Sequence, residues 1–459
     1  MVEMTTVPRL EDYDISPETG FLPQELPLIR LPQEYYQPWE VLLDNLPHLL
    51  MTQTVRKHIQ KLPNLTTDQL SNVREYRRAY QCLSFLAHAY IWGTSSEPLD
   101  RLCAQIADPL VKVSNYLGLP PLATYAGLCM WNFKTIMPLK ESETNPWWDN
   151  LDNLSTINTY TGSFDESWFY IVSVYFEKFG ANVINTGIEL FANCVHDEPE
   201  KLALNLQKLA ELIDVLGSVV LKMEEMCDPH TFYFRIRPYL AGWLNMADAG
   251  LHKDGVFYEG QTNMRFKLAG GSNAQSSLVQ FIDSLLGIKH YSTGERPLQK
   301  ELRRNEQSSS AAPQSSFMND MQNYMPRKHR EFLQVLEATS PIHEYVKANS
   351  EKHPGLIISY DGALAMMKLF RDKHIQIVTR YIVLQAKQSN KLGSSTTLRS
   401  GLARRKKEER GTGGTSLLPF LKQCRDETGD PAVGTWGKRI LTDGVMQLKY
   451  SQKNGINED

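Results

Sequence analysis

The sequence predicts an all-α protein, and two observations carry this prediction. Apolar residues recur at three- and four-residue steps over several long stretches, as amphipathic helices require. Alternating runs rich in Val, Ile and Thr between hairpin turns are nearly absent, so a large sheet is not expected. With 42% hydrophobic and 22% charged residues, the 459-residue chain has globular composition, which excludes a wholly disordered, collagen-like or simple coiled-coil protein.

Four helices stand out along the chain. The first covers residues 75–92 and ends at Gly93, a residue type that commonly terminates helices. The longest regular stretch, LNLQKLAELIDVLGSVVLKMEEM, predicts a helix over residues 204–226. The same spacing predicts helices over residues 278–288 and 360–384.

Three polar stretches divide the chain. Residues 141–162 mark the expected boundary between a smaller N-terminal helical domain (residues 1–150) and a larger C-terminal helical domain (residues 151–459). Residues 292–316 and 388–410 are expected to be flexible loops, because Ser and charged residues dominate them. The basic run at residues 404–407 is either a nuclear signal or, as is commoner, a solvated charge run.

The overall charge excludes several partners. With 49 basic and 52 acidic residues the formal charge is −3, so no strong field draws the protein to nucleic acid or to an anionic membrane. No apolar run approaches the roughly 18 residues of a membrane span. The acidic N-terminus has neither a secretory nor a transit pattern. We therefore expect a soluble, cytoplasmic protein with no nucleic-acid or membrane partner.

Common catalytic and structural motifs are missing. The six cysteines lie far apart without a Cys-x-x-Cys pair, which favours reduced thiols over a disulfide framework or a structural zinc site. None of the 11 histidines belongs to an HExxH motif. The nucleophile elbow, the P-loop and the dinucleotide-binding fingerprint are also absent.

His374 differs from the other histidines because it lies inside a strongly periodic helix. The residues at four- and seven-residue steps from it are apolar or aromatic: Met367, Phe370, Val378 and Tyr381. An apolar wall carrying one imidazole is the setting of an axial haem ligand. The alternative is a core histidine satisfied by a single hydrogen bond.

Seven short strings resemble the indoleamine 2,3-dioxygenase family in order and spacing. They are LPPLATYA at 119–126, FYIVS at 169–173, R-x-Y-L-x-G-W at 237–243, AGGSNAQSS at 269–277, YMPRKHREFL at 324–333, RDKHIQIVTRYI at 371–382 and GTGGT at 411–415. The resemblance implies a two-domain helical fold that holds haem b mainly in the larger domain. It also implies addition of both atoms of O2 across the indole C2–C3 bond of L-tryptophan. The product is N-formylkynurenine, and the reaction opens the kynurenine pathway toward NAD. An external reductant keeps the iron ferrous, and a monomer is expected.

The resemblance also implies roles for individual residues. His374 matches the iron ligand, and Arg371 matches the arginine at a haem propionate, steadied by Asp283. The remaining cofactor contacts would be Ser173, Gly271, Ser272, Asn273 and Val279. For Arg371 and Asp283 an ordinary surface ion pair is the alternative.

A second set of residues matches the substrate pocket of the family. Ser173, Phe232 and Arg237 match its catalytic positions, with Arg237 binding the substrate carboxylate and Ser173 tuning polarity without acting as a base. Substrate contacts are expected from Tyr125, Leu128, Cys129, Phe169, Phe232, Arg237 and Thr412. For Phe169 and Phe232, plain core packing remains the alternative. Thr412 matches the threonine of a loop that closes on the substrate. The alternative for Thr412 is the end of a flexible linker.

The sequence also departs from the mammalian pattern of the family. Leu128, Cys129, Asn273 and Val279 replace other residues near the pocket, and Pro238 follows Arg237. These changes leave the affinity for L-tryptophan open. Two further functions stay open: a related haem protein that stores or carries O2, as myoglobins of this fold do, and a low-affinity paralogue.

Overall fold

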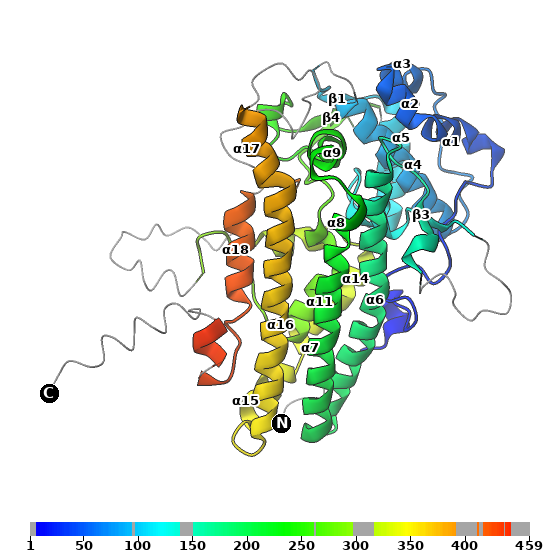
Figure 1. Cartoon of the computed structure of the whole chain (residues 1–459). Helices are drawn as coiled ribbons and strands as arrows, with labels where there is room; N and C mark the ends of the chain where they lie inside the picture. Colours follow the sequence, from blue (N-terminus) through cyan, green and yellow to red (C-terminus); the bar gives the residue numbers. More distant parts are fainter. Residues whose placement is uncertain are drawn as a thin grey trace.

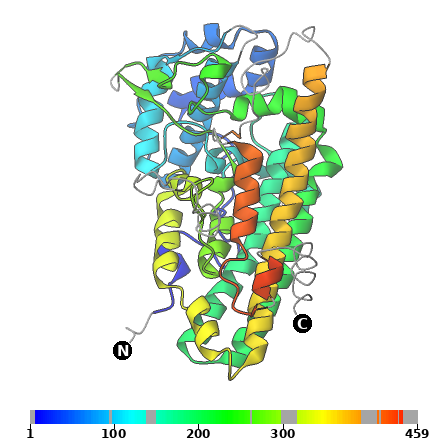
Figure 2. The same ribbon diagram turned by 90° about the vertical axis from the view of Figure 1, so that its left-hand side faces the viewer.

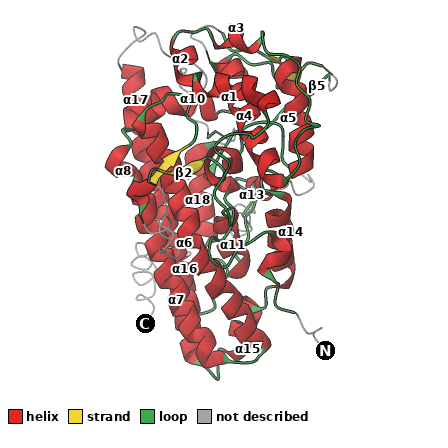
Figure 3. Cartoon of the chain, turned by 90° about the vertical axis from the view of Figure 1, so that its right-hand side faces the viewer, coloured by secondary structure: helices red, strands yellow, loops and turns green. Residues whose placement is uncertain are grey.

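Helices dominate the structure. The computed structural model describes residues 6–93, 97–137, 150–260, 263–296, 316–391, 411–412, 416–435 and 437–441. Within these ranges the strands are only two or three residues long, whereas the longest helix has 32 residues (Figure 3). The predicted all-α fold class is therefore confirmed.

The α-helices follow the chain from the N-terminal to the C-terminal part. They are α1 Gln37–Asp44, α2 Leu46–Met51, α3 Val55–Ile59, α4 Val73–Trp92, α5 Ala104–Leu117, α6 Phe164–Val195, α7 Pro199–Leu221, α8 Met223–Met226, α9 Pro229–Thr231, α10 Arg237–Leu240, α11 Ser277–Leu285, α13 Phe317–Gln322, α14 Arg327–Thr339, α15 Ile342–Asn349, α16 Pro354–Val378, α17 Leu384–Lys391 and α18 Leu417–Glu427. Short 3₁₀ helices are η1 Leu10–Tyr13, η2 Glu34–Tyr36, η4 Leu151–Asn153, η6 Ala247–Ala249 and η7 Asn273–Gln275.

Three long helices, α6, α7 and α16, form the frame of the C-terminal part. They run side by side, with α7 packed against both α6 and α16, and α18 lies along α16 (Figures 1 and 2). Ser163 caps α6 by accepting a hydrogen bond from the Glu166 amide. Helices α7 and α16 each begin with a proline, whose missing N–H is not needed in a first turn.

Helix α11 docks closely on α6 because α6 presents a glycine at the contact. A Cβ atom added to Gly187 would lie 2.4 Å from Cζ of Phe281, so only glycine allows this approach. The contact matters for the site because α11 carries Val279 and Asp283. It holds these residues at a fixed distance from α6.

The N-terminal part is built around the nearly fully buried helix α4, which packs against α5. Two side chains of α4 bond directly to the last turn and the C-terminal end of α10. His88 Nδ1 lies 2.7 Å from the Tyr239 carbonyl, and Trp92 Nε1 donates to the Ala241 carbonyl at 2.8 Å. One continuous hydrophobic core runs through both parts of the chain.

Two small sheets complete the fold. Strand β4 (Val256–Tyr258) pairs in parallel with β1 (Arg101–Leu102) and antiparallel with β5 (Met264–Phe266). Strands β2 (Phe133–Thr135) and β3 (Leu154–Thr156) pair antiparallel on either side of the expected domain boundary. The boundary itself stays a prediction.

The four predicted helices are present, with shifted ends. The first begins at Val73, and the second begins at Pro199 and is split at Lys222 into α7 and α8. The third ends at Leu285, before Gly287 with φ +69°. The fourth begins at Pro354 and continues through a π-helical segment into α17.

One loop boundary needs correction. Residues 388–410 were expected to be a loop, yet α17 continues to Lys391, because no glycine or proline interrupts the sequence between Leu384 and Lys391. Residues 392–410, including the basic run at 404–407, and residues 297–315 of the other expected loop lie outside the described residues.

Two further expectations concern the whole chain. All six cysteines are free and buried, which agrees with the predicted reduced thiols. Within the described residues, no helix is both long and apolar enough to cross a membrane.

Candidate functional site

A deep, mostly apolar cavity of about 240 Å³ lies between α6, α16 and α18. Its wall contains fourteen of the residues that the sequence singled out: Tyr125, Leu128, Cys129, Phe169, Ser173, Phe232, Arg237, Gly271, Ser272, Asn273, Val279, Arg371, His374 and Thr412. These positions span almost 300 residues of chain, and the fold brings them to one place. Asp283, the remaining residue to which the resemblance gives a role, lies behind the wall.

Three π-helical segments contribute to this wall. They are η3 (Ala126–Met130), η5 (Phe232–Ile236) and η8 (Thr379–Val383). Each places at least one residue in the cavity wall, among them Leu128, Phe232 and Tyr381. π-Helical turns are rare and occur frequently at functional sites, because the extra residue re-aims the side chains around it.

The π-helical turn at η5 has a local cause. Pro238 lies in the first turn of α10, directly after Arg237, and cannot donate a backbone hydrogen bond to the preceding turn. The helical run from α9 to α10 widens just before it. Arg237 then lies fully buried at the cavity, with its guanidinium carbon 5.1 Å from the centre of the Tyr233 ring.

His374 projects into the cavity from α16. Phe370, Val378 and Tyr381 line the cavity beside it, whereas Met367 is buried and does not reach the wall. Within the described residues the imidazole has no hydrogen-bonding partner, so it is not a core histidine satisfied by one bond. Burial, together with the positive charge of Arg371, lowers the pKa of His374 to about 4. The imidazole is therefore neutral and has an unshared electron pair to offer.

Several aromatic rings line the cavity together with His374. The rings of Phe169 and Phe232 lie with centroids 4.9 Å apart at 57°, and Phe232 meets Tyr381 edge-on at 5.7 Å. Such tilted contacts suit a flat aromatic ligand. The hydroxyl of Ser173 donates to the Phe169 carbonyl at 3.3 Å, one turn back along α6.

Glu177 and Gln275, two buried side chains that were not predicted from the sequence, position this wall. The hydroxyls of Tyr125 and Ser276 both donate to Oε1 of Glu177, at 3.1 and 2.6 Å. Burial raises the pKa of Glu177 to about 7, although both hydroxyls lower it. Gln275 accepts a bond from the Tyr125 amide at 2.9 Å and donates to the Gly270 carbonyl at 2.8 Å. Glu177 lies one turn after Ser173, and that spacing was the one available signal.

A tight glycine turn closes one side of the cavity. A Cβ atom on Gly270 would lie 2.2 Å from the Leu240 carbonyl oxygen, so this turn requires glycine at that position. A Cβ atom on Gly271 would lie 2.4 Å from Cδ1 of Leu128, so the leucine side chain would have to move. Ser272 caps the 3₁₀ helix that starts at Asn273 by accepting from the Ala274 amide. The amide of Gly270 donates to the carbonyl of Thr412 at 3.2 Å. This bond holds the Thr412 segment against the turn.

Arg371 and Asp283 form a buried pair at the edge of the cavity. Nη2 of Arg371 donates to both Asp283 oxygens at 2.7 Å, and the side chains are only 8% and 5% exposed. The surface-pair alternative is therefore excluded. Arg371 also donates to the Thr428 hydroxyl. Burial opposes the charge on Asp283, but Arg371 and His290 hold the pKa of this carboxyl below its usual value.

The residues around the cavity fit a haem. A neutral imidazole without a hydrogen bond, in an apolar wall, is the donor that an axial iron position needs. The glycine turn leaves room where a side chain would intrude. A buried guanidinium at the cavity edge is suited to a carboxylate such as a propionate.

Fold and site together define a class: a helical protein with a deep apolar cavity suited to a prosthetic group and a flat ligand. The sequence profile named Indoleamine 2,3-dioxygenase matches residues 9–431. The chain is 44% identical to indoleamine 2,3-dioxygenase of Saccharomyces cerevisiae, over 93% of this chain and 94% of the relative. It is 34% identical to 6-hydroxytryptophan 2,3-dioxygenase of Fusarium equiseti (91% and 96%). It is 31% identical to indoleamine 2,3-dioxygenase 1 of Rattus norvegicus (91% and 94%). The chain belongs to the indoleamine 2,3-dioxygenase family and is a dioxygenase.

Proposed function

We propose that this protein is a haem dioxygenase that converts L-tryptophan and O2 to N-formylkynurenine, the first step of the kynurenine pathway toward NAD. The observation that carries the proposal is the shared cavity of His374 and Arg237. One side chain offers a neutral nitrogen to a metal, and the other offers a buried guanidinium to a carboxylate.

His374 would hold haem b through its imidazole, and Arg371, fixed by Asp283, would bind a propionate. Ser173, Gly271, Ser272, Asn273 and Val279 would complete the cofactor contacts. When bound, haem b supplies the ferrous iron that binds and activates O2, and an external reductant keeps it ferrous. Because α11 holds Asp283 and α16 holds Arg371 and His374, two rigid helices would fix the cofactor.

The substrate would lie with its indole ring among Tyr125, Leu128, Cys129, Phe169 and Phe232. Its carboxylate would bind Arg237, whose planar guanidinium can donate two parallel hydrogen bonds. Fixing both ends of the substrate orients the C2–C3 bond, and orientation is a large share of catalysis. The chain would therefore contribute to catalysis by positioning the substrate.

Ser173 would tune the polarity of the pocket without acting as a base. Its hydroxyl already donates to the Phe169 carbonyl, and its side-chain neighbours are the Tyr125 hydroxyl and the Cys129 thiol, whose pKa values burial raises, so both stay protonated. The indole ring is electron-rich enough to be oxidised without losing its N–H proton first. Thr412, held at Gly270, would help to close the pocket and exclude water.

The proposal is tested by purifying the protein with haem, reducing it and adding L-tryptophan and O2. We expect a Soret band and the near-ultraviolet absorbance of N-formylkynurenine. Haem with reversible O2 binding and no product would favour the O2-carrying alternative. Protein that takes up no haem would refute both functions.

Substrate range needs a panel, because a relative is named for 6-hydroxytryptophan. L-Tryptophan, 6-hydroxy-L-tryptophan and tryptamine should be compared by kcat/KM in one preparation. We expect L-tryptophan to be preferred; preference for the hydroxylated indole, or a very high KM for every indole, would favour a specialised or low-affinity paralogue. The monomeric state and the cytoplasmic location stay predictions.

A further inference from the structure

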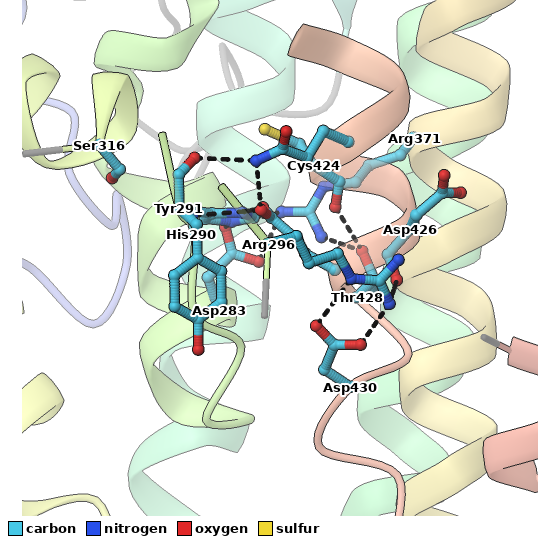
Figure 4. Close-up of polar contacts among 12 residues, drawn as sticks. Asp283, His290, Tyr291, Arg296, Ser316, Arg371, Cys424, Asp426, Thr428 and Asp430 are labelled. Carbon is cyan, nitrogen blue, oxygen red and sulfur yellow. Dashed lines mark hydrogen bonds and ion pairs between the residues drawn. The ribbon is translucent and has the colours of Figure 1, made fainter. Parts of the chain in front are cut away.

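A second cluster of ligating side chains lies beside the cavity and has no part in the proposed reaction. It consists of His290, in the loop after α11, and of Cys424 and Glu427, one turn apart on α18. One ligand atom from each of the three side chains lies within 4.8 Å of the others. The polar contacts around this cluster are drawn in Figure 4. We propose that His290, Cys424 and Glu427 form a zinc site.

The donor set is the first argument. Imidazole nitrogen, thiolate sulfur and carboxylate oxygen are the ligands that zinc prefers, at about 2.0–2.3 Å. Around a tetrahedral zinc such atoms lie about 3.3–3.8 Å apart. His290 Nδ1 and Glu427 Oε2 are 2.7 Å apart, so these two atoms would have to move apart by about 0.6–1.1 Å to admit the metal.

The contacts behind the ligands are the second argument. His290 Nε2 lies 3.1 Å from Asp283, so a carboxylate orients the ring and leaves Nδ1 for the metal. Oε1 of Glu427 accepts from Gln423 Nε2 at 2.7 Å and from the Tyr291 amide at 3.1 Å. Metal-binding histidines and carboxylates in proteins are typically held by such contacts. Both anchors leave the proposed ligand atoms facing one another.

Burial and position are the third argument. The His290 and Glu427 side chains are 6% and 0% exposed, so the site is shielded from bulk water. Cys424 also lines the cavity, so the cluster borders the proposed haem pocket through its sulfur. Nδ1 of His290 faces Glu427, whereas Nε2 faces Asp283. Zinc would bind at Nδ1 and at the Cys424 sulfur, and any proton on these two atoms would leave to solvent.

The site would tie α18 to the loop after α11. Helix α18 follows the Thr412 segment in the chain, and Thr428 at its end contacts Arg371. A metal at this point would therefore hold the C-terminal segment against the haem-binding wall. The three ligands are distinct from His374 and from the proposed substrate contacts, although Asp283, which would steady Arg371, also orients His290.

The test is equilibrium dialysis of the haem-loaded full chain against buffered zinc sulfate, with zinc and iron measured in the same sample by mass spectrometry. We expect one zinc per chain in addition to haem iron. Variants His290→Gln and Cys424→Ser should each weaken zinc binding at least about tenfold. Control variants His343→Gln, which alters another histidine beside a carboxylate, and Cys194→Ser, another buried thiol, should bind zinc like the wild type.

The zinc K-edge absorption spectrum of the wild-type protein decides the matter if a variant fails to fold. We expect a sulfur scatterer at about 2.3 Å and nitrogen or oxygen scatterers at about 2.0–2.2 Å. Absence of the sulfur shell, zinc protoporphyrin emission that accounts for the zinc, or equal binding by wild type and both cluster variants would overturn the proposal. The zinc proposal is judged by the zinc content, and the dioxygenase proposal by the formation of N-formylkynurenine. A protein that binds zinc and haem but forms no product would contradict only the dioxygenase proposal.

Discussion

Arg371 and Asp283 are 88 residues apart in sequence, yet one guanidinium nitrogen lies 2.7 Å from both carboxylate oxygens of Asp283. The pair is buried, and Asp283 also contacts His290. It links α16, which carries His374, to α11, which packs on α6. This pair therefore fixes the relation between two walls of the cavity.

Asp283→Asn should lower the free energy of unfolding by about 3–5 kcal/mol, because it leaves the Arg371 charge buried without its partner. The pKa of Asp283 is lowered in the folded protein, so the contribution of the carboxylate is present above the unfolded pKa of about 3.8 and is lost as pH falls through the folded pKa. The deficit of the variant should therefore shrink below about pH 3.8. Urea unfolding from pH 7 to pH 3 measures it.

A control substitution at an exposed ion pair separates burial from charge. Glu189 and Lys208 are 3.5 Å apart and about half exposed, so Glu189→Gln should cost about 0–1 kcal/mol. Equal destabilisation by Glu189→Gln and Asp283→Asn would refute the role of the buried pair.

Arg237→Gln should raise KM for L-tryptophan about tenfold to a hundredfold, since a charge-assisted bond contributes about 1.5–3 kcal/mol. Haem content should not change. Tryptamine, which lacks the carboxylate, serves as the matched ligand. If the substitution weakens tryptamine and L-tryptophan equally, Arg237 does not bind the carboxylate.

Ser173→Ala should retain substantial turnover, within about tenfold of the wild type, because one neutral hydrogen bond contributes about 1 kcal/mol. The substitution also leaves the Phe169 carbonyl in its helical hydrogen bond. Turnover and haem content are measured together. A haem-loaded but inactive variant would mean that Ser173 carries a proton in the reaction.

Glu177→Gln should flatten the dependence of stability on pH. The folded protein holds the Glu177 proton up to a pKa of about 7, against 4.5 in the unfolded chain, so stability falls as pH rises between these values. The total loss is about 3 kcal/mol. Denaturation at pH 5 and pH 8 should show a smaller difference for the variant, and an unchanged difference would assign the pH dependence to other groups.

The sequence was sufficient for three long helices and for most of the cavity wall. Periodicity predicted α4, α7 and α16. It missed α6, the longest helix, because the apolar residues of α6, such as Tyr170, Ile171 and Val172, do not keep to one face. The strands escaped prediction because two or three residues cannot show alternation. The π-helical turns also have no periodic signal, although Pro238 marks one of them.

Long-range polar pairing is the part that could not be predicted. Glu177 meets Ser276 across 99 residues, and His290 meets Glu427 across 137. Glu177, His290 and Glu427 belong to none of the family-like strings, so only the folded chain shows what they contact. For the same reason residue patterns left Arg371 and Asp283 open between a surface pair and a buried one.

The most direct test of the account is His374→Ala, analysed for haem content and for the rate of N-formylkynurenine formation in one preparation. His343→Ala, at a partly exposed histidine, is the matched control. We predict that His374→Ala loses most of its haem and all measurable turnover, whereas the control keeps both. A variant at position 374 that retains full red colour and the wild-type rate would contradict the account.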